Sequence, residues 1–316
     1  MAAFRRSLDV LMLLPAAWTV AGDSTLSIAV AWLWVPPARP TGVAAFSDEL
    51  RLSIRHLLQV HPQLAPAATL WIGGSLTNVS DLPADLNGAL TVRALPTTVL
   101  GVKMTGYAAK AWVLIASRVR NGYIVFFDGD VFQCEGWLGH LTSTALTSGY
   151  DVVWSLEAEG VRCGGYRNGS CALAVSPSIA NNATELAEYV SFGERNTGTV
   201  FAVRRSSATV AWMRDTIRLY GQLIASGLVT GNGGLADQPA WRESFFLHRN
   251  SLKERLIWRQ QACHKMLIAP KNCSCWCTCG PCLYVHGHNA ARQCLGILGH
   301  VGSRPSTGGQ GGRWGV

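Results

Sequence analysis

The stretch Tyr123-Ile124-Val125-Phe126-Phe127-Asp128-Gly129-Asp130-Val131-Phe132 decides how this chain can fold. Its apolar start is typical of a buried β-strand, and it stops abruptly at two carboxylates separated by a glycine. Residues i and i+2 of an extended chain point to the same side, so Asp128 and Asp130 are expected to face one point just beyond the strand. Gly129 lets the backbone bend there at little steric cost.

These two carboxylates predict a site for a divalent cation. Paired oxygen ligands suit Mg²⁺ or Mn²⁺ carrying a phosphate, and open α/β sheets bind their ligands at the carboxyl edge of the strands. The alternative interpretation is a strand that ends in an ordinary Asp-Gly turn. The motif alone does not decide between the two, so the rest of the chain has to.

Apolar runs and helical periodicities alternate along the chain. Further strands are predicted at residues 27–33, 68–72, 89–95, 151–156 and 199–203, with short candidates at 266–269 and 283–285. Helices are predicted from about Ser47, over 107–119 and 137–147, from a cap at Ser207 to Gly227, and from Asp237, with a loop over 157–182. Such alternation predicts an α/β fold with crossover helices.

Composition indicates one folded domain with anionic partners. The 316 residues are 48% hydrophobic and 15% charged, which is ample for a large core. No repeat or linker divides the chain, so residues 23–300 are expected to form a single domain and the Gly-rich residues 301–316 a disordered tail. The net charge of +8 favours nucleotides or phosphates, but no basic run is dense enough to predict nucleic-acid binding.

Cysteines and glycosylation sequons favour the secretory pathway. The chain has ten cysteines and four N-x-S/T sequons, at Asn78, Asn168, Asn182 and Asn272. Residues 1–22 have the features of a secretory signal, with a basic start, an apolar region and small residues near the end. The apolar region is too short to span a bilayer. A buried N-terminal segment is the alternative, and membrane association through the N-terminus stays open.

Four stretches, taken in order, resemble glycosyltransferases of the GT-A fold in the nucleotide-diphospho-sugar transferase group. They are GYAAKAWVLIASRVRNGYIVFFDGDVF (106–132), NTGTVFAVRRSSATVAWMRDTIRLY (196–220), LADQPAWRESFF (235–246) and YVHGH (284–288). The resemblance covers roughly residues 27–292. It implies a Rossmann-type mixed sheet with helices on both faces. It also implies metal-dependent transfer of a sugar from a nucleoside diphosphate donor to a hydroxyl of a glycan or protein-linked acceptor, in the Golgi lumen.

The resemblance also implies roles for individual residues. Asp128 and Asp130 correspond to the D-x-D that holds Mn²⁺ or Mg²⁺ on the donor diphosphate, with His286 as third ligand and His288 as its alternative. Asp237 corresponds to the catalytic carboxylate, acting as base or stabilising an oxocarbenium-like state. The remaining donor-binding residues that it implies are Lys110, Asn196, Gly198, Gln238 and His288.

Each role has a structural alternative. Lys110 is either a phosphate ligand or a solvated lysine, and Asn196-Thr197-Gly198 is either a donor contact or a plain turn before a strand. Asp237 also suits a helix N-cap. The two histidines also suit a surface loop.

The cysteines near the C-terminal end depart from the family pattern. The segment CSCWCTCGPC (273–282) lacks the spacing of a zinc finger, and disulfides to Cys263, Cys294 or Cys134 are expected instead within a Cys-rich segment over 263–294. If this segment displaces the loop of His286, that residue is not a metal ligand.

Two other functions are weighed. A haloacid-dehalogenase-type phosphatase would use Asp128 as nucleophile and Asp130 as general acid, but its motif normally lies on the first strand. A non-catalytic secreted binding protein is the second alternative.

Overall fold

The computed structural model describes residues 27–35, 43–73, 86, 88–104, 106–117, 119, 122–129, 131–133, 136–146, 148–158, 175, 177–227, 238–257 and 284–286. For some of these, including 196–200 and 284–286, only the backbone is described. The predicted signal, the predicted strand at 266–269, the tail and all ten cysteines lie outside the described residues.

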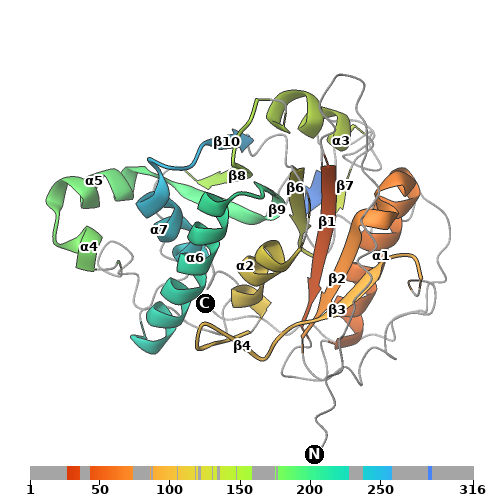
Figure 1. The fold of residues 1–316 in the computed structure, drawn as a ribbon, viewed down its shortest axis with the longest axis horizontal. Helices are drawn as coiled ribbons and strands as arrows, with labels where there is room; N and C mark the ends of the chain where they lie inside the picture. Colours follow the sequence, from red (N-terminus) through yellow and green to blue (C-terminus); the bar gives the residue numbers. More distant parts are fainter. Residues whose placement is uncertain are drawn as a thin grey trace, which may run out of the picture.

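A seven-stranded mixed sheet forms the centre of the protein (Figure 1). Its strand order is β10-β8-β9-β6-β1-β2-β3, and β9 runs antiparallel to both of its neighbours while every other pairing is parallel. The strands are β1 (Ser27–Trp34), β2 (Ala68–Ile72), β3 (Thr91–Ala94), β6 (Gly122–Phe127), β8 (Val152–Ala158), β9 (Glu194–Arg204) and β10 (Glu254–Ile257). The predicted α/β mixed sheet is therefore confirmed.

Two small antiparallel pairs accompany the sheet. One joins β4 (Thr98–Val99) to β5 (Val102–Lys103), and the other joins β7 (Val131–Gln133) to β11 (Tyr284–His286). The second pair places residues 284–286 beside the segment that follows β6.

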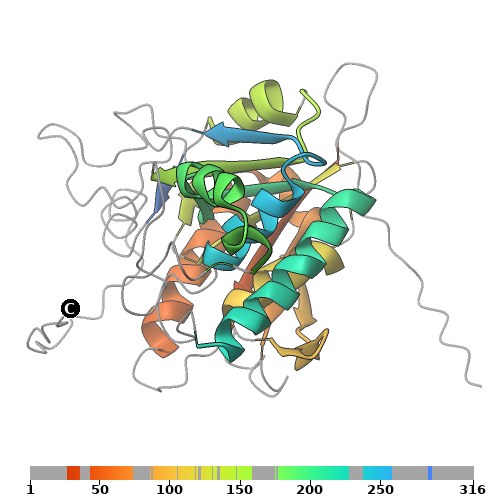
Figure 2. The same cartoon turned by 90° about the vertical axis from the view of Figure 1, so that its left-hand side faces the viewer.

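Helices cover both faces of the sheet because its strands are apolar on both sides. Along β1, Val30 and Trp32 pack on the face covered by α1 (Val43–Val60), whereas Ala29 and Ala31 pack on the opposite face. The first face also carries the 3-10 helix η2 (Pro62–Ala67) and α3 (Trp137–His140). The opposite face carries α2 (Gly106–Ala116), α6 (Ser207–Ala225) and α7 (Gln238–His248) (Figures 1 and 2).

A smaller core lies beside α7. The short helix α4 (Pro177–Ala180) and helix α5 (Ala183–Ser191) pack Ile179 and Tyr189 against Phe246 of α7. Figure 1 shows α4 and α5 at the outer margin of the molecule, away from β1 and β2. Within the described residues, no helix combines the length and the apolar character that crossing a bilayer requires.

Several predicted boundaries are wrong. The first helix begins at Val43 and not near Ser47, and Ser206 rather than Ser207 caps α6. The predicted loop over 157–182 contains the end of β8 and all of α4, while α5 and β10 were not predicted. The predicted helix over 137–147 changes after His140 into a π-helix, η5 (Leu141–Leu146). Local patterns do not locate ends that are set by contacts with distant segments.

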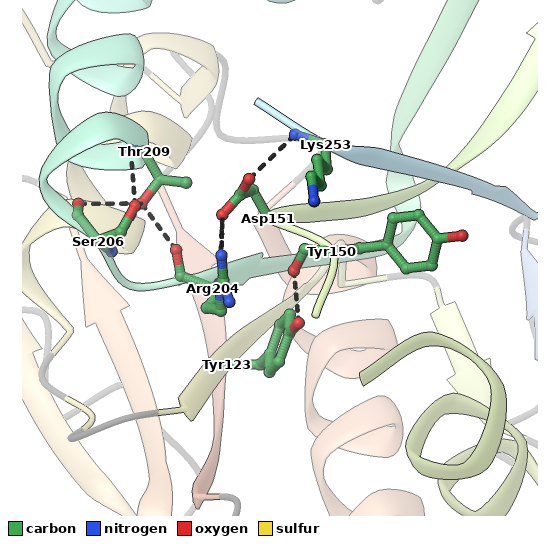
Figure 3. Close-up of polar contacts among 7 residues, drawn as sticks. All are labelled: Tyr123, Tyr150, Asp151, Arg204, Ser206, Thr209 and Lys253. Atoms are coloured by element: carbon green, nitrogen blue, oxygen red, sulfur yellow. Dashed lines mark hydrogen bonds and ion pairs between the residues drawn. The ribbon is translucent and has the colours of Figure 1, made fainter. Parts of the chain in front are cut away.

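Polar contacts tie the amino edge of the sheet together (Figure 3). Asp151 accepts hydrogen bonds from the Arg204 guanidinium at 2.6 Å and from the backbone N–H of Lys253 at 3.0 Å. Tyr123, at the start of β6, donates its hydroxyl to the carbonyl of Tyr150, and burial raises the pKa of this hydroxyl. These contacts join β6, β8, β9 and β10 at the edge where β6 begins.

Gly122 allows β1 and β6 to approach at that same edge. A Cβ atom at this position would lie 1.9 Å from the carbonyl oxygen of Ser27. We expect Gly122→Ala to lower the free energy of unfolding by about 1–3 kcal/mol, because the backbone of one strand must shift. The measurement is chemical denaturation. Gly139→Ala is the control, since a Cβ there meets nothing within 4 Å, and an equal effect of both substitutions would contradict the close approach.

Candidate active site at the carboxyl edge of the sheet

The sheet changes direction of winding between β1 and β6. From β1 the chain crosses through α1 to β2 and then β3 on one side, and it later returns through α2 to place β6 on the other side of β1. Because α1 and α2 lie on opposite faces, the carboxyl ends of these two strands form a topological switch point, and the ligand-binding crevice of an open α/β sheet is expected outside it. Asp128 is the residue that follows β6.

Asp128 forms an ion pair with Lys110 of α2. The Lys110 Nζ lies 3.0 Å from Oδ1 and 3.2 Å from Oδ2 of Asp128, and 5.7 Å from the centre of the Phe126 ring. The lysine side chain is 8% exposed and the carboxylate 28% exposed. The interpretation of Lys110 as a solvated lysine is therefore wrong, and the pair places one positive and one negative charge at the crevice.

The backbone after Asp128 turns closely against α1. The N–H of Val131 donates to the Asp128 carbonyl at 3.2 Å, and a Cβ on Gly129 would lie 3.3 Å from the Cβ of Leu50. A glycine is thus favoured here by close approach to α1, a reason that the sequence motif did not reveal. Asp130 lies outside the described residues, and its predicted role as a metal ligand stays a prediction.

Two side chains of α1 fix β7 in place. Ser53 donates its hydroxyl to the carbonyl of Val131 at 2.6 Å, and the His56 Nε2 lies 2.6 Å from the carbonyl of Gln133. The strand that continues the D-x-D segment is therefore attached to the same helix that borders the crevice. Sequence reasoning missed both residues, because neither lies near the motif in the chain.

The first three residues of YVHGH, 284–286, lie beside β7, the strand that follows the D-x-D motif. In the antiparallel pair of β7 and β11, His286 is opposite Val131 and Val285 is opposite Phe132. His286 belongs to the strand and does not follow it, contrary to the sequence interpretation. Its backbone lies next to the residue after Asp130, although the side chains of β11 and the whole of His288 lie outside the description. Their ligand and donor-binding roles stay predictions.

The N-x-G element lies in an irregular part of β9. Phe201 of β9 pairs with Phe126 on β6 and with Trp154 on β8. The next residue of β8, Ser155, pairs with Asn196, five residues earlier in β9. Residues 197–200, including Gly198, thus have no counterparts in β8, as in an enlarged bulge. The interpretation of Asn196-Thr197-Gly198 as a turn before a strand is wrong. The bulge lies beside the carboxyl end of β6, and contact with a donor sugar stays a prediction.

Helix α7 is buried along most of its length and carries two buried charges. It begins at Gln238, directly after Asp237, which itself lies outside the described residues. Arg242 and Glu243 are fully buried, and the Arg242 Nε donates to the Tyr189 hydroxyl at 2.9 Å. Sequence reasoning missed both charges. The position of Arg242 and Glu243 between the apolar Trp241 and the Phe245-Phe246 pair was a usable signal, since buried ions need partners.

The donor atoms at the crevice fit a hard divalent cation in part. Among the described residues, no three His, Cys, Asp or Glu side chains gather into a metal-binding group. Asp128 supplies carboxylate oxygen, the ligand type that Mg²⁺ and Mn²⁺ prefer. The two further ligands implied by the resemblance, Asp130 and His286, have no described side chains.

No protein-family model matches the chain, and no curated protein matches it. The solved structures that are similar to it include galactosyltransferase LgtC in complex with donor and acceptor sugar analogues, at 12% identity over 75% of this chain and 74% of LgtC, with a TM-score of 0.43. An active-site mutant of LgtC matches at 12% identity over 88% of this chain and 98% of that one, with a TM-score of 0.47.

Glucosyl-3-phosphoglycerate synthase from Mycobacterium tuberculosis, in complex with Mn²⁺, UDP and phosphoglyceric acid, is another similar structure. It has 16% identity over 61% of this chain and 63% of the synthase, with a TM-score of 0.35. These neighbours are GT-A nucleotide-diphospho-sugar transferases, the group that the four sequence stretches resemble.

The burial of His56 predicts a pH dependence of stability. Burial lowers the pKa of His56 from its ordinary value of 6.5, so the unfolded chain binds a proton at a pH where the folded protein does not. Stability is therefore expected to fall as the pH drops below 6.5. We expect the loss of unfolding free energy between about pH 8 and about pH 5 to be smaller in His56→Gln than in the wild type. Equal losses, measured by urea denaturation, would contradict this.

Proposed function

We propose that this chain is a metal-dependent glycosyltransferase that moves a sugar from a nucleoside diphosphate donor to a hydroxyl acceptor on a glycan or protein. One observation carries the proposal. The Asp128–Lys110 pair lies at the carboxyl end of β6, where the sheet changes its direction of winding, and β11 (Tyr284–His286) pairs with β7, the strand that follows this end. A crevice of this kind suits a nucleotide, and its two charges suit a diphosphate with its counter-ion.

The residues around the crevice would divide the binding of the donor between them. Asp128, with Asp130 and His286, would hold Mn²⁺ or Mg²⁺, which when bound supplies positive charge for the leaving diphosphate. Lys110 adds a second positive charge at this edge, and its stem packs near the Phe126 ring. A buried, paired lysine is held in one place, so its charge is available without a large loss of side-chain entropy.

The other predicted residues would act on the sugar. Asn196 and Gly198 lie at the bulge of β9, the strand that pairs with β6. We assign both residues to the binding of the donor sugar. Gln238 is buried at the start of α7, and we assign it to the sugar hydroxyls. Asp237 would act as base or stabilise positive charge at the reacting carbon. His288 stays assigned to the donor.

We also propose a place in the secretory pathway, in the Golgi lumen. Ten cysteines and four sequons support an oxidising, glycosylating compartment. The basic net charge is compatible with an anionic donor.

The experiment combines ligand binding with turnover. Thermal unfolding is measured with a panel of nucleoside diphosphates and nucleotide sugars, with and without Mn²⁺, since a ligand that binds the folded state raises the melting temperature. The donor found in this way is then used to measure hydrolysis and transfer by the wild type, Asp128→Asn and Asp130→Ala. We expect both substitutions to lower turnover by about 100-fold or more, because they remove ligands of the cation that would stabilise the leaving diphosphate.

A matched control tests whether removal of a carboxylate outside the candidate site also lowers turnover. Asp215→Asn removes a carboxylate that is 45% exposed on α6 and paired with Arg218, and we expect it to leave turnover unchanged. If Asp130→Ala turned over donor as well as the wild type, the assignment would be wrong. Release of phosphate from simple monoesters would indicate the phosphatase, and donor binding without turnover would indicate the binding protein.

A further inference from the structure

One of the four sequons lies in the described part of the chain, at the start of α5. It consists of Asn182, Ala183 and Thr184, and all three residues are exposed. The other three sequons, at Asn78, Asn168 and Asn272, lie outside the described residues. A sequon is an acceptor only where its asparagine is accessible, and this condition is met at Asn182.

Asn182 is also the N-cap of α5. Its Oδ1 accepts hydrogen bonds from the backbone N–H of Thr184 at 3.1 Å and of Glu185 at 3.2 Å. This is the usual role of asparagine at a helix start, where it satisfies N–H groups that have no partner within the helix. In the described part of the chain, none of the hydrogen bonds of Asn182 uses its Nδ2.

The two functional groups of this amide are therefore separate. Oδ1 is used by the fold, and Nδ2, the atom to which an N-linked glycan attaches, is not. A glycosylated asparagine keeps its carbonyl oxygen, so the modified side chain can cap α5 with the same two bonds. Modification and helix capping are compatible at this position.

The surroundings leave room for a large substituent. The α4–α5 unit buries Ile179 and Tyr189 toward α7, whereas Asn181, Asn182 and Ala183 face solvent. In Figure 1, α4 and α5 form the left-hand margin of the molecule, with α7 and β9 between them and β1. A glycan at this turn would extend away from the sheet and leave the crevice at Asp128 uncovered.

We propose that Asn182 carries an N-linked glycan. The donor class is an oligosaccharide joined to a polyprenyl diphosphate, and an oligosaccharyltransferase is the enzyme class. A bond forms between C1 of the first sugar and Nδ2, the bond between C1 and the diphosphate oxygen breaks, Nδ2 loses one proton, and the polyprenyl diphosphate leaves. This inference rests on the proposed place in the secretory pathway, but it does not rest on the proposed transferase activity, since it concerns a different surface of the protein.

The experiment uses the full chain, with its own N-terminus, produced in eukaryotic cells. The occupancy of position 182 is measured by mass spectrometry of the peptide that contains it, before and after enzymatic removal of N-glycans. Four proteins are compared: the wild type, Asn182→Asp, Thr184→Ala and Thr184→Ser. Asn182→Asp keeps a good N-cap but has no amide nitrogen, whereas Thr184→Ala keeps Asn182 and loses the hydroxyl of the sequon.

We expect a glycan at position 182 in the wild type and in Thr184→Ser, and its complete loss in Asn182→Asp and Thr184→Ala. Thermal unfolding of Asn182→Asp is expected to match that of Thr184→Ala, which keeps the asparagine cap of α5 and carries no glycan. An unmodified Asn182 in the wild type would overturn the proposal. A modification that persists in Thr184→Ala would overturn it as well, because the sequon would not be its cause.

Discussion

The parallel pairing of β1 with β6 is the contact on which the rest of this structure depends. It runs from Ser27 beside Gly122 to Trp32 beside Phe127, and it is the point where two oppositely wound parts of the sheet meet. Helix α1 connects β1 to β2 on one side of this pair, and helix α2 leads into β6 on the other side. The two helices therefore lie on opposite faces of the sheet. The crevice expected at its carboxyl end would thus be a consequence of topology. A longer or shorter β6 would move Asp128 away from it.

A second constraint is electrostatic. Lys110 is almost fully buried, and burial of an unpaired ammonium group is costly. The ion pair with Asp128 offsets this cost, and it holds both groups at the crevice before any ligand arrives. Breaking a buried pair by removing one partner is more destabilising than replacing both. The charge at this edge is therefore part of the fold as well as part of the candidate site.

The elements with strong periodicity could be predicted from the sequence alone. The apolar run before Asp128, the strand over 27–33 and the long helix after Ser206 are close to where they were expected, because each depends on its own residues. The ends and irregularities could not be predicted. The position of His286 in a strand depends on pairing with β7, and the bulge near Gly198 depends on two neighbouring strands at once. Helix α5 follows the Gly-, Asn- and Ser-rich segment that was predicted as a loop, and its buried face is defined by the packing of Tyr189 on Phe246 of α7.

The candidate site shows the same division. The sequence identified Asp128 and Lys110 separately, but only the packing of α2 against β6 shows that they are partners.

The most direct test of the account is a crystal structure with Mn²⁺ and a nucleoside diphosphate, with the metal located by its anomalous scattering. The account predicts Mn²⁺ bonded to a carboxylate oxygen of Asp128, with the diphosphate in the crevice between β1 and β6. A metal bound elsewhere, with Asp128 still paired to Lys110 and no nucleotide at this edge, would contradict it.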